Sequence, residues 1–162
     1  MNLEELYSRH GERLFRYLVF RLGSAEDAED ALQEAFCRFA RYGLRWRFVR
    51  DPQAFVFRVA RNEANRSLRR RLRRREEERT MAHDDGPGFA APFLPPEDKE
   101  LAWVLSAAEK LPAEQKEIVF LKILEGLTFK EIGAVCEIPL NTAASRYRLA
   151  IARLREAAGG RP

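Results

Sequence analysis

The sequence predicts an all-α fold: two small helical domains joined by a flexible linker, the second domain built around a helix-turn-helix. Apolar residues recur with the period of an amphipathic helix along both halves of the 162-residue chain. Residues 79–100 instead hold four prolines and two glycines without a clear period, as linkers do. We therefore expect a first domain over residues 1–78, a linker over 79–100 and a second domain over 101–162.

Two helices are expected ahead of residue 43. Asn2 and Glu5 have the spacing of a capping box, and Gly23 follows the last apolar residue of the first helix. Ser24 then caps a second helix. The buried stripe of this second helix is expected to contain Ala28, Ala31, Leu32, Ala35, Phe36 and Phe39.

A third helix is expected after a loop over residues 43–50. Asp51 followed by Pro52 is a strong start signal, because aspartate caps free N–H groups and proline fits the first helical position. The apolar side of this helix is expected to contain Phe55, Val56, Val59, Ala60, Ala64 and Leu68.

The second domain is expected to begin with helices over residues 97–110 and 113–125, and Gly126 ends the latter. Thr128 and Glu131 then form a second capping-box pair. A short helix to residue 136, a turn over 137–140 and a final helix from Asn141 or Thr142 to about 157 have the order of a helix-turn-helix. Its inward residues are expected to be Ile132, Val135, Ala143 and Tyr147, with Gly133 where the helices approach.

The outer side of the final helix is predicted to contact DNA. Asparagine, arginine and serine read base edges, and arginine, threonine and serine also hold phosphates. The alternative is a three-helix bundle whose basic face is merely solvated. The outward residues are Asn141, Thr142, Ala144, Ser145, Arg146 and Arg148.

Composition argues against a metal site and against catalysis. The cysteines, Cys37 and Cys136, lie far apart, and His10 and His83 are the only histidines. Because no nucleophile–base pair, phosphate loop or metal-ligand spacing occurs, we expect no cofactor, no metal and no enzymatic activity. The N-terminus is unlike a secretory signal and no apolar run approaches about 18 residues, so we expect a cytoplasmic protein without membrane insertion.

Positive charge is concentrated over residues 58–75, where nine arginines stand against Glu63. Such a block calls for an anionic partner, and nucleic acid is favoured over a solvated charged face. In the preceding loop, Trp46 and Phe48 either stack on unpaired bases or belong to the core. The arginines are Arg58, Arg61, Arg66, Arg69, Arg70, Arg71, Arg73, Arg74 and Arg75.

Negative charge gathers on the second helix, where Asp27, Glu29, Asp30 and Glu34 occur beside Gln33. Acids in the first turn of a helix complement its dipole, which explains Asp27 better than the later ones. The other interpretation is a docking face for a basic helix of a partner.

Three stretches together resemble bacterial sigma factors of the extracytoplasmic-function type: DAEDALQEAFCRF (27–39), DPQAFVFRVARNEANRSLRRR (51–71) and LPAEQKEIVFLKILEGLTFKEIGAVCEIPLNTAASRYRLAIARLRE (111–156). The resemblance covers almost the whole chain, including the order of the domains. It implies a factor that binds core RNA polymerase and gives it promoter specificity. The implied partners are the clamp helices of the largest subunit, the flap of the second largest, promoter DNA and an anti-sigma factor.

The resemblance also implies three sets of contact residues. The clamp helices are expected to meet Asp27, Asp30, Gln33, Glu34 and Phe36. The -10 element is expected to meet Trp46, Arg47, Phe48, Arg50, Arg58, Arg61, Asn62, Arg66, Arg69 and Arg70. The -35 element is expected to meet Asn141, Thr142, Ser145, Arg146 and Arg148. The acidic linker either threads a polymerase channel or is a solvated spacer.

Several residues depart from the family pattern. Glu137 stands where a glycine is usual, so it either adopts a left-handed conformation at a cost of about 1 kcal/mol or the turn differs. Ala144, Leu149 and Ile151 replace basic residues, which predicts fewer phosphate contacts or a Leu149–Ile151 face buried on a partner. Arg66 replaces an aspartate.

Other functions stay open. A sigma-like mimic would sequester an anti-sigma factor without touching DNA; the weakened basic character of the last helix favours it, whereas the intact acidic segment and arginine block argue against it. A homodimeric helix-turn-helix repressor would need a dimerisation helix, and neither half has an obvious spare one.

Overall fold

The computed structural model describes residues 2–79 and 99–159, and every regular element within these ranges is a helix. The chain divides into two compact units, Met1–Phe93 and Leu94–Pro162. The all-α expectation is confirmed. The predicted linker over 79–100 lies almost entirely outside the described residues.

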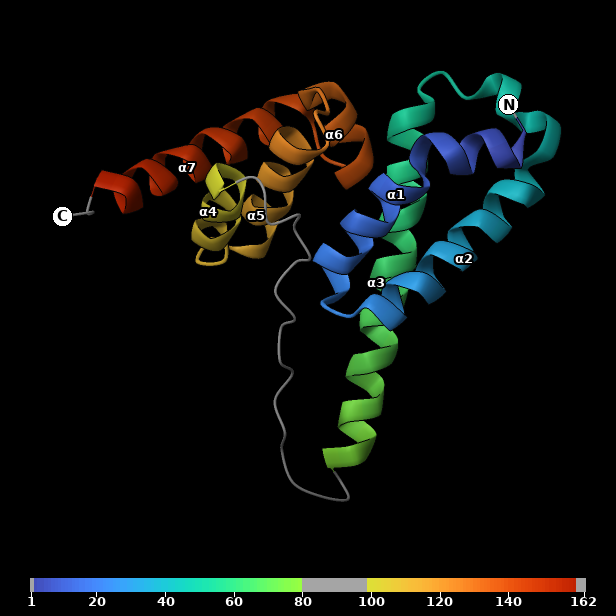
Figure 1. The fold of residues 1–162 in the computed structure, drawn as a ribbon, viewed down its shortest axis with the longest axis horizontal. Coiled ribbons are helices and arrows are strands. Elements are labelled where there is room, and N and C mark those ends of the chain that lie inside the picture. The colour runs from blue at the N-terminus through green and yellow to red at the C-terminus, as the bar shows by residue number, and fades with distance from the viewer. Residues whose placement is uncertain (1, 80–98, 160–162) are drawn as a thin grey trace. The chain divides into compact units, whose positions relative to one another are not determined.

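The first unit contains α1 (Leu3–Leu22), α2 (Ala25–Tyr42), a 3-10 helix η1 (Gly43–Phe48) and α3 (Pro52–Arg79). The three α-helices pack against one another, and the C-terminal part of α3 extends beyond the other two (Figure 1). The core between them is formed mainly by Leu14, Tyr17, Leu18, Ala28, Ala35, Phe39, Val56, Phe57 and Ala60.

The local start and stop signals of this unit are confirmed. The Asn2 side chain accepts a hydrogen bond from the Glu5 amide at 2.7 Å, and Gly23 ends α1 with φ 67°. Ser24 caps α2 through the Asp27 amide. The Asp51 side chain accepts from the Ala54 amide at 3.0 Å, which starts α3.

The first unit differs from the prediction in the segment between α2 and α3 and in the buried faces of these two helices. The expected loop over 43–50 is wrong, because Gly43–Phe48 forms a 3-10 helix. Phe36 is only half-buried, since it lies at the edge of the α1–α2 contact. Phe57 and Glu63 are buried on α3, although the pattern omitted both. The reason is that α3 packs against α1 and α2 together, so its buried face is wider than one stripe.

The second unit contains α4 (Lys99–Ala108), α5 (Ala113–Val119), a π-helix η2 (Phe120–Leu124), α6 (Phe129–Cys136) and α7 (Leu140–Gly159). The prediction of one α-helix over 113–125 is therefore wrong in its last part, because residues 120–124 form a wider π-helical turn. The Glu125 amide donates to the Phe120 carbonyl at 3.3 Å, and Gly126 has φ 66°.

The core of the second unit lies where α5, α6 and α7 meet. It buries Ile118, Phe120, Leu121, Leu127, Ile132, Val135 and Ala143 completely or nearly so. A second apolar cluster joins Ala108 and Leu111, Val119, Ala150 and Leu154. Among the described residues, no helix combines the length and the apolar character that a membrane span requires.

Candidate functional site

The predicted helix-turn-helix is formed by α6, a short turn and α7. Thr128 and Glu131 make a complete capping box at the start of α6, with bonds of 3.2 and 2.6 Å. Ile132 and Val135 are fully buried, as expected. These contacts fix the short helix against the rest of the unit, and so they determine the face that α7 presents.

The turn between α6 and α7 depends on two unusual backbone positions. Glu137 ends α6 in the left-handed conformation, with φ 57° and ψ 44°, so the first of the two expectations for it is confirmed. A Cβ atom on Gly133 would lie 2.8 Å from the Ile138 carbonyl oxygen. The glycine therefore lets the turn pass directly over α6.

The outer side of α7 presents the predicted DNA-contacting residues. Asn141, Ser145 and Arg148 are exposed, and Thr142 is half-buried. Arg148 donates to the Ser145 hydroxyl at 3.2 Å, whereas Arg146 pairs with Glu114 of α5 at 3.3 Å. The structure thus brings the five predicted residues onto neighbouring turns of one helix, with Arg146 held at the edge.

Two of the three apolar replacements on α7, Leu149 and Ile151, do not share a face. Leu149 is 56% exposed, whereas Ile151 packs against the cluster of Ala108, Leu111 and Leu154. A continuous Leu149–Ile151 surface for a partner is therefore not formed. Tyr147 also packs against that cluster, and its ring contacts Phe129 edge to face at 5.4 Å.

The arginine block occupies α3 and runs along more than one side of it. Arg66, Arg69 and Arg70 are exposed, and so is Asn62. Arg58 instead lies over the Phe55 ring, with 5.8 Å from its guanidinium carbon to the ring centroid. The block therefore mixes side chains available to an anion with side chains engaged inside the protein.

A buried carboxylate lies among the arginines. Glu63 is only 3% exposed, and its side chain pairs with Arg38 of α2 and with Arg66 one turn further along α3. A buried acid is tolerated when cations compensate it, as here. Glu63 thereby ties α2 to α3 and holds Arg66, a role that the sequence pattern did not reveal.

The two aromatic residues of η1 behave differently. The Trp46 indole N–H donates to the Phe39 carbonyl at 3.2 Å, and its ring contacts Phe55 edge to face at 5.2 Å. Phe48, in contrast, is 78% exposed, and Arg47 and Arg50 are exposed as well. Trp46 therefore holds η1 against α2 and α3, and Phe48 is the aromatic residue of η1 whose ring is exposed for stacking.

Of the predicted docking residues on α2, Asp30, Gln33 and Glu34 are exposed. Asp27 differs, because its carboxylate forms an ion pair with Arg71 of α3. Arg71 also donates to the Leu22 carbonyl at 3.1 Å. This arginine therefore joins the end of α1, the start of α2 and the middle of α3.

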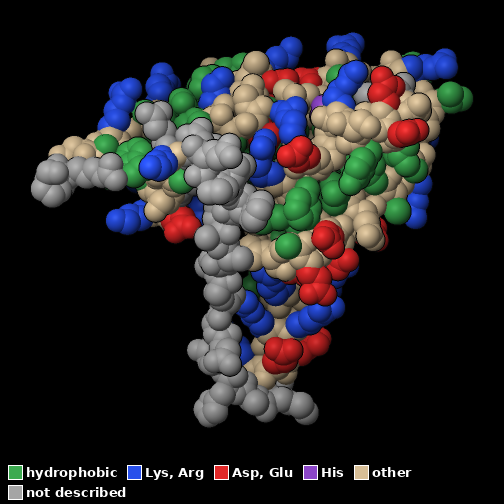
Figure 2. Space-filling model, viewed as in Figure 1, with side chains coloured by type: hydrophobic (Ala, Val, Ile, Leu, Met, Phe, Trp, Pro, Cys, Tyr) green, Lys and Arg blue, Asp and Glu red, His purple; other side chains and the backbone are tan. Residues whose placement is uncertain are grey.

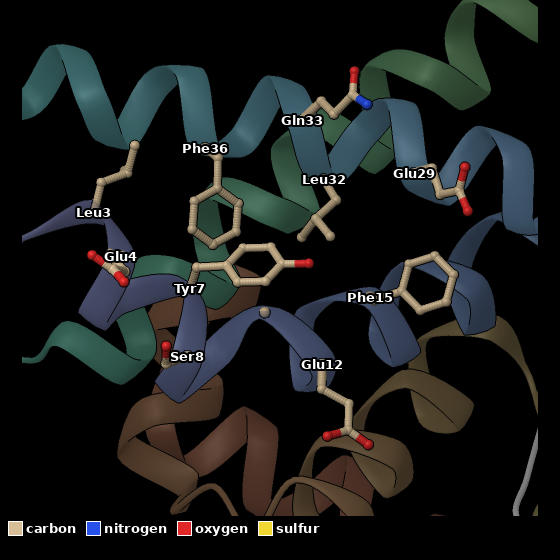
Figure 3. A pocket seen from close by; sticks show the side chains of 11 residues that line it. Leu3, Glu4, Tyr7, Ser8, Glu12, Phe15, Glu29, Leu32, Gln33 and Phe36 are labelled. Carbon is tan, nitrogen blue, oxygen red and sulfur yellow. The ribbon is translucent and has the colours of Figure 1, made fainter.

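An apolar groove between α1 and α2 was not predicted. Tyr7, Phe15, Leu32 and Phe36 point into it from the two helices, and carboxylates lie along its edges (Figure 3). Its volume is about 1150 Å³. Figure 2 shows the hydrophobic strip with acidic side chains around it. The signal in the sequence is the spacing of four between Leu3, Tyr7, Gly11 and Phe15, which forms a second apolar stripe on α1.

A metal site is not supported within the described ranges, where no group of three histidine, cysteine or acidic side chains converges. Cys37 is exposed and Cys136 is half-buried.

Family comparisons match both units. The Sigma-70 region 2 family matches residues 6–74, and the Sigma-70, region 4 family matches residues 101–154. The region 2 match covers most of α1, all of α2 and η1, and α3 through nearly all of the arginine block. The region 4 match covers the second unit with its helix-turn-helix.

Two characterised relatives are similar along most of the chain. The ECF RNA polymerase sigma factor SigE of Mycolicibacterium smegmatis is 35% identical over 94% of this chain, which spans 60% of that protein's length. The RNA polymerase sigma factor CarQ of Myxococcus xanthus is 30% identical over 96% of this chain and 88% of its own.

Two solved structures share the fold. The sigma factor RpoE of Bartonella quintana, solved with the anti-sigma factor NepR, has a TM-score of 0.76 at 19% identity, covering 98% of both chains. CnrH, solved with the cytosolic domain of CnrY, has a TM-score of 0.67 at 20% identity, covering 99% of this chain and 89% of its own.

Proposed function

Because the chain belongs to the extracytoplasmic-function type of RNA polymerase sigma factors, we propose that it binds core RNA polymerase and directs it to promoters. The observation that carries this proposal is the presence of both family regions in one chain and in order, each with several residues of its predicted interface exposed. The proposal includes no catalytic step by this chain. The polymerase supplies the chemistry of RNA synthesis.

The second unit is proposed to read the -35 element through α7. Asn141, Ser145 and Arg148 lie exposed near the start of this helix, where a recognition helix contacts base edges. Arg146 is the candidate for a bidentate contact to guanine, since it lies beside them and its present partner, Glu114, is 71% exposed. Thr142 and Ser145 would hold phosphates beside them.

The first unit is proposed to bind the -10 element with η1 and α3. Phe48 supplies an exposed ring, Arg47 and Arg50 are exposed on either side of it in the sequence, and Asn62 is exposed further along α3. Stacking on a flipped base offsets an unstacking cost of a few kcal/mol. The exposed arginines of α3 would hold the backbone phosphates.

Docking on polymerase is proposed for the exposed acids of α2. Asp30 and Glu34 lie one turn apart, and their charge suits the basic clamp helices of the largest subunit. Gln33 lies beside them and also lines the apolar groove that contains Phe36. Contact between the second unit and the flap of the second-largest subunit completes the proposed assembly. The neighbouring apolar groove suits an amphipathic helix with basic flanks, and an anti-sigma factor is the proposed occupant when polymerase is absent.

The test is run-off transcription with bacterial core polymerase and a pool of promoter fragments from the source genome. We expect specific transcripts only when this protein is added. If no transcript appears and the protein fails to bind core polymerase, the proposed function is wrong. The sigma-like mimic then becomes the leading function, and capture of an anti-sigma factor becomes the next assay.

A further inference from the structure

The acids of α2 and the arginines of α3 face the same cleft. This acid–arginine cleft has a volume of about 360 Å³ and is lined on one side by Asp27, Asp30 and Glu34. The opposite side is formed by Arg70, Arg71 and Arg74, with Ser67 between them. Figure 2 shows acidic and basic side chains next to each other in this part of the first unit.

A second hollow continues the same arrangement along α3. It has a volume of about 450 Å³, and Glu34 and Glu63 face four arginines there. These arginines recur with the spacing of one helical face, so they form a single row. Glu34 and Arg70 line both hollows. The row consists of Arg66, Arg69, Arg70 and Arg73.

Neutralisation across the two helices is already present in the acid–arginine cleft, where Asp27 of α2 pairs with Arg71 of α3. Glu63, which lines the second hollow, pairs with Arg66 within α3 and with Arg38 of α2. The exposed acids and arginines further out line the same small spaces, so their charges act on each other within the Debye length, about 10 Å at 0.1 M salt. The positive field of the arginine row is therefore weakened by carboxylates on α2.

We propose that the α2 acids screen the α3 arginines in the free protein, and that docking of core polymerase onto α2 frees these arginines for promoter DNA. The inference rests on the proposed function, because it uses the docking face and the phosphate-binding row of that function. The physical reason is that a basic polymerase helix takes over the carboxylates, which raises the positive potential of the row. Binding of polymerase and binding of DNA are then reciprocally coupled.

The screening half of the proposal can be tested on the free chain with a fluorescent single-stranded oligonucleotide. The cleft variant carries Asp30→Asn and Glu34→Gln, which remove two exposed charges without changing shape. The matched control carries Glu26→Gln and Glu29→Gln, two exposed acids on the same helix that line neither hollow. Both variants have the same net charge. A difference between their affinities for the oligonucleotide therefore depends on where the removed charges lie.

We expect the cleft variant to bind the oligonucleotide about three- to tenfold more tightly than the wild type, and the control less than twofold. The salt dependence should also steepen in the cleft variant, since each further phosphate that the arginines neutralise adds about 0.7 to the slope for a single strand. Circular dichroism checks that both variants remain folded. Equal increases in affinity in the two variants, or no increase in either, would overturn the proposal.

Failure of this inference can be told apart from failure of the proposed function. Core binding and run-off transcription by the wild type test the function alone. If the wild type transcribes and both variants bind the oligonucleotide equally, the function stands and the screening is wrong. If the wild type fails to bind polymerase while the cleft variant still binds the oligonucleotide more tightly, the acids screen the arginines but polymerase does not relieve them, and the coupling is wrong.

Discussion

The carboxylate of Asp27 on α2 is ion-paired with the guanidinium of Arg71 on α3, a residue 44 positions further along the chain. Arg71 also bonds the Leu22 carbonyl at the end of α1. This contact gives both residues a role inside the first unit, although the family resemblance placed Asp27 on the docking face and the charge pattern placed Arg71 in the arginine block.

Reversal of Asp27 alone should destabilise the first unit, whereas exchange of the two charges should restore part of the loss. Asp27→Arg is expected to cost about 1 kcal/mol, because both side chains are partly exposed and the new cation opposes the helix dipole. The double variant Asp27→Arg with Arg71→Asp should regain about half of it. Thermal unfolding measures both. No recovery in the double variant would contradict a pairwise contact.

Asp27 is expected to contribute to the stability of the first unit and not to the docking on core polymerase. Asp27→Asn should change core-polymerase affinity by about twofold or less, since the carboxylate is held by Arg71. Reversal of both Asp30 and Glu34 to lysine should abolish polymerase binding while circular dichroism stays unchanged. If Asp27→Asn weakens binding as strongly as the double reversal, Asp27 contacts the polymerase directly.

The turn of the helix-turn-helix contains a residue whose backbone strain a glycine would remove. Glu137 has φ 57°, so Glu137→Gly should stabilise the second unit by about 1 kcal/mol, because glycine has no Cβ to clash in the left-handed region. Glu137→Ala keeps a Cβ and should be nearly neutral, which makes it the matched control. Thermal unfolding compares them, and equal effects of glycine and alanine would exclude backbone strain as the cause.

Gly133 should not tolerate a side chain. A Cβ at this position would lie 2.8 Å from the Ile138 carbonyl oxygen, which belongs to the backbone and cannot rotate away. Gly133→Ala is therefore expected to destabilise the second unit by about 1–3 kcal/mol and to weaken -35 binding. Ala134→Gly, at the exposed neighbouring position, controls for a change in helix propensity. A stable Gly133→Ala variant would mean that the turn can shift outward.

Arg146 should determine specificity at one position of the -35 element. Its replacement by alanine is expected to cost about 1–3 kcal/mol on the preferred sequence and to relax selection at one base pair. Glu114→Gln, which removes its partner in the free protein, should leave that selection intact. Binding to a set of singly substituted promoter fragments measures this. An equal loss on every fragment would show that Arg146 holds only phosphate.

Protonation of His10 should destabilise the first unit below neutral pH. Burial lowers the pKa of His10 below its usual 6.5, and Arg13 and Arg9 lower it further. The unfolded chain then binds a proton that the folded chain does not, so stability falls as pH decreases through 6.5 toward the folded pKa. His10→Gln should flatten this slope between about pH 7.5 and 5.5. Unfolding measured across this pH range checks the prediction, and an unchanged slope in His10→Gln would show that another group titrates.

By itself the sequence determined the α-helices, the caps that start most of them and the family, but not η1 or the π-helix η2. Caps such as Ser24, Asp51 and Thr128 bond amides within their own first turn, so a short stretch of sequence contains the whole signal. The helix-turn-helix followed from the same local spacing, because Ile132 and Val135 on α6, and Ala143 and Tyr147 on α7, recur with the helical period.

Only the tertiary structure decided which charged and aromatic residues are available to partners. Glu63 and Trp46 have partners on other elements, and Asp27 meets an arginine 44 positions away. Such pairs depend on how α2 and α3 are rotated about their axes, which no local pattern specifies. The apolar groove and the acid–arginine cleft exist for the same reason, since each forms between the facing sides of two helices.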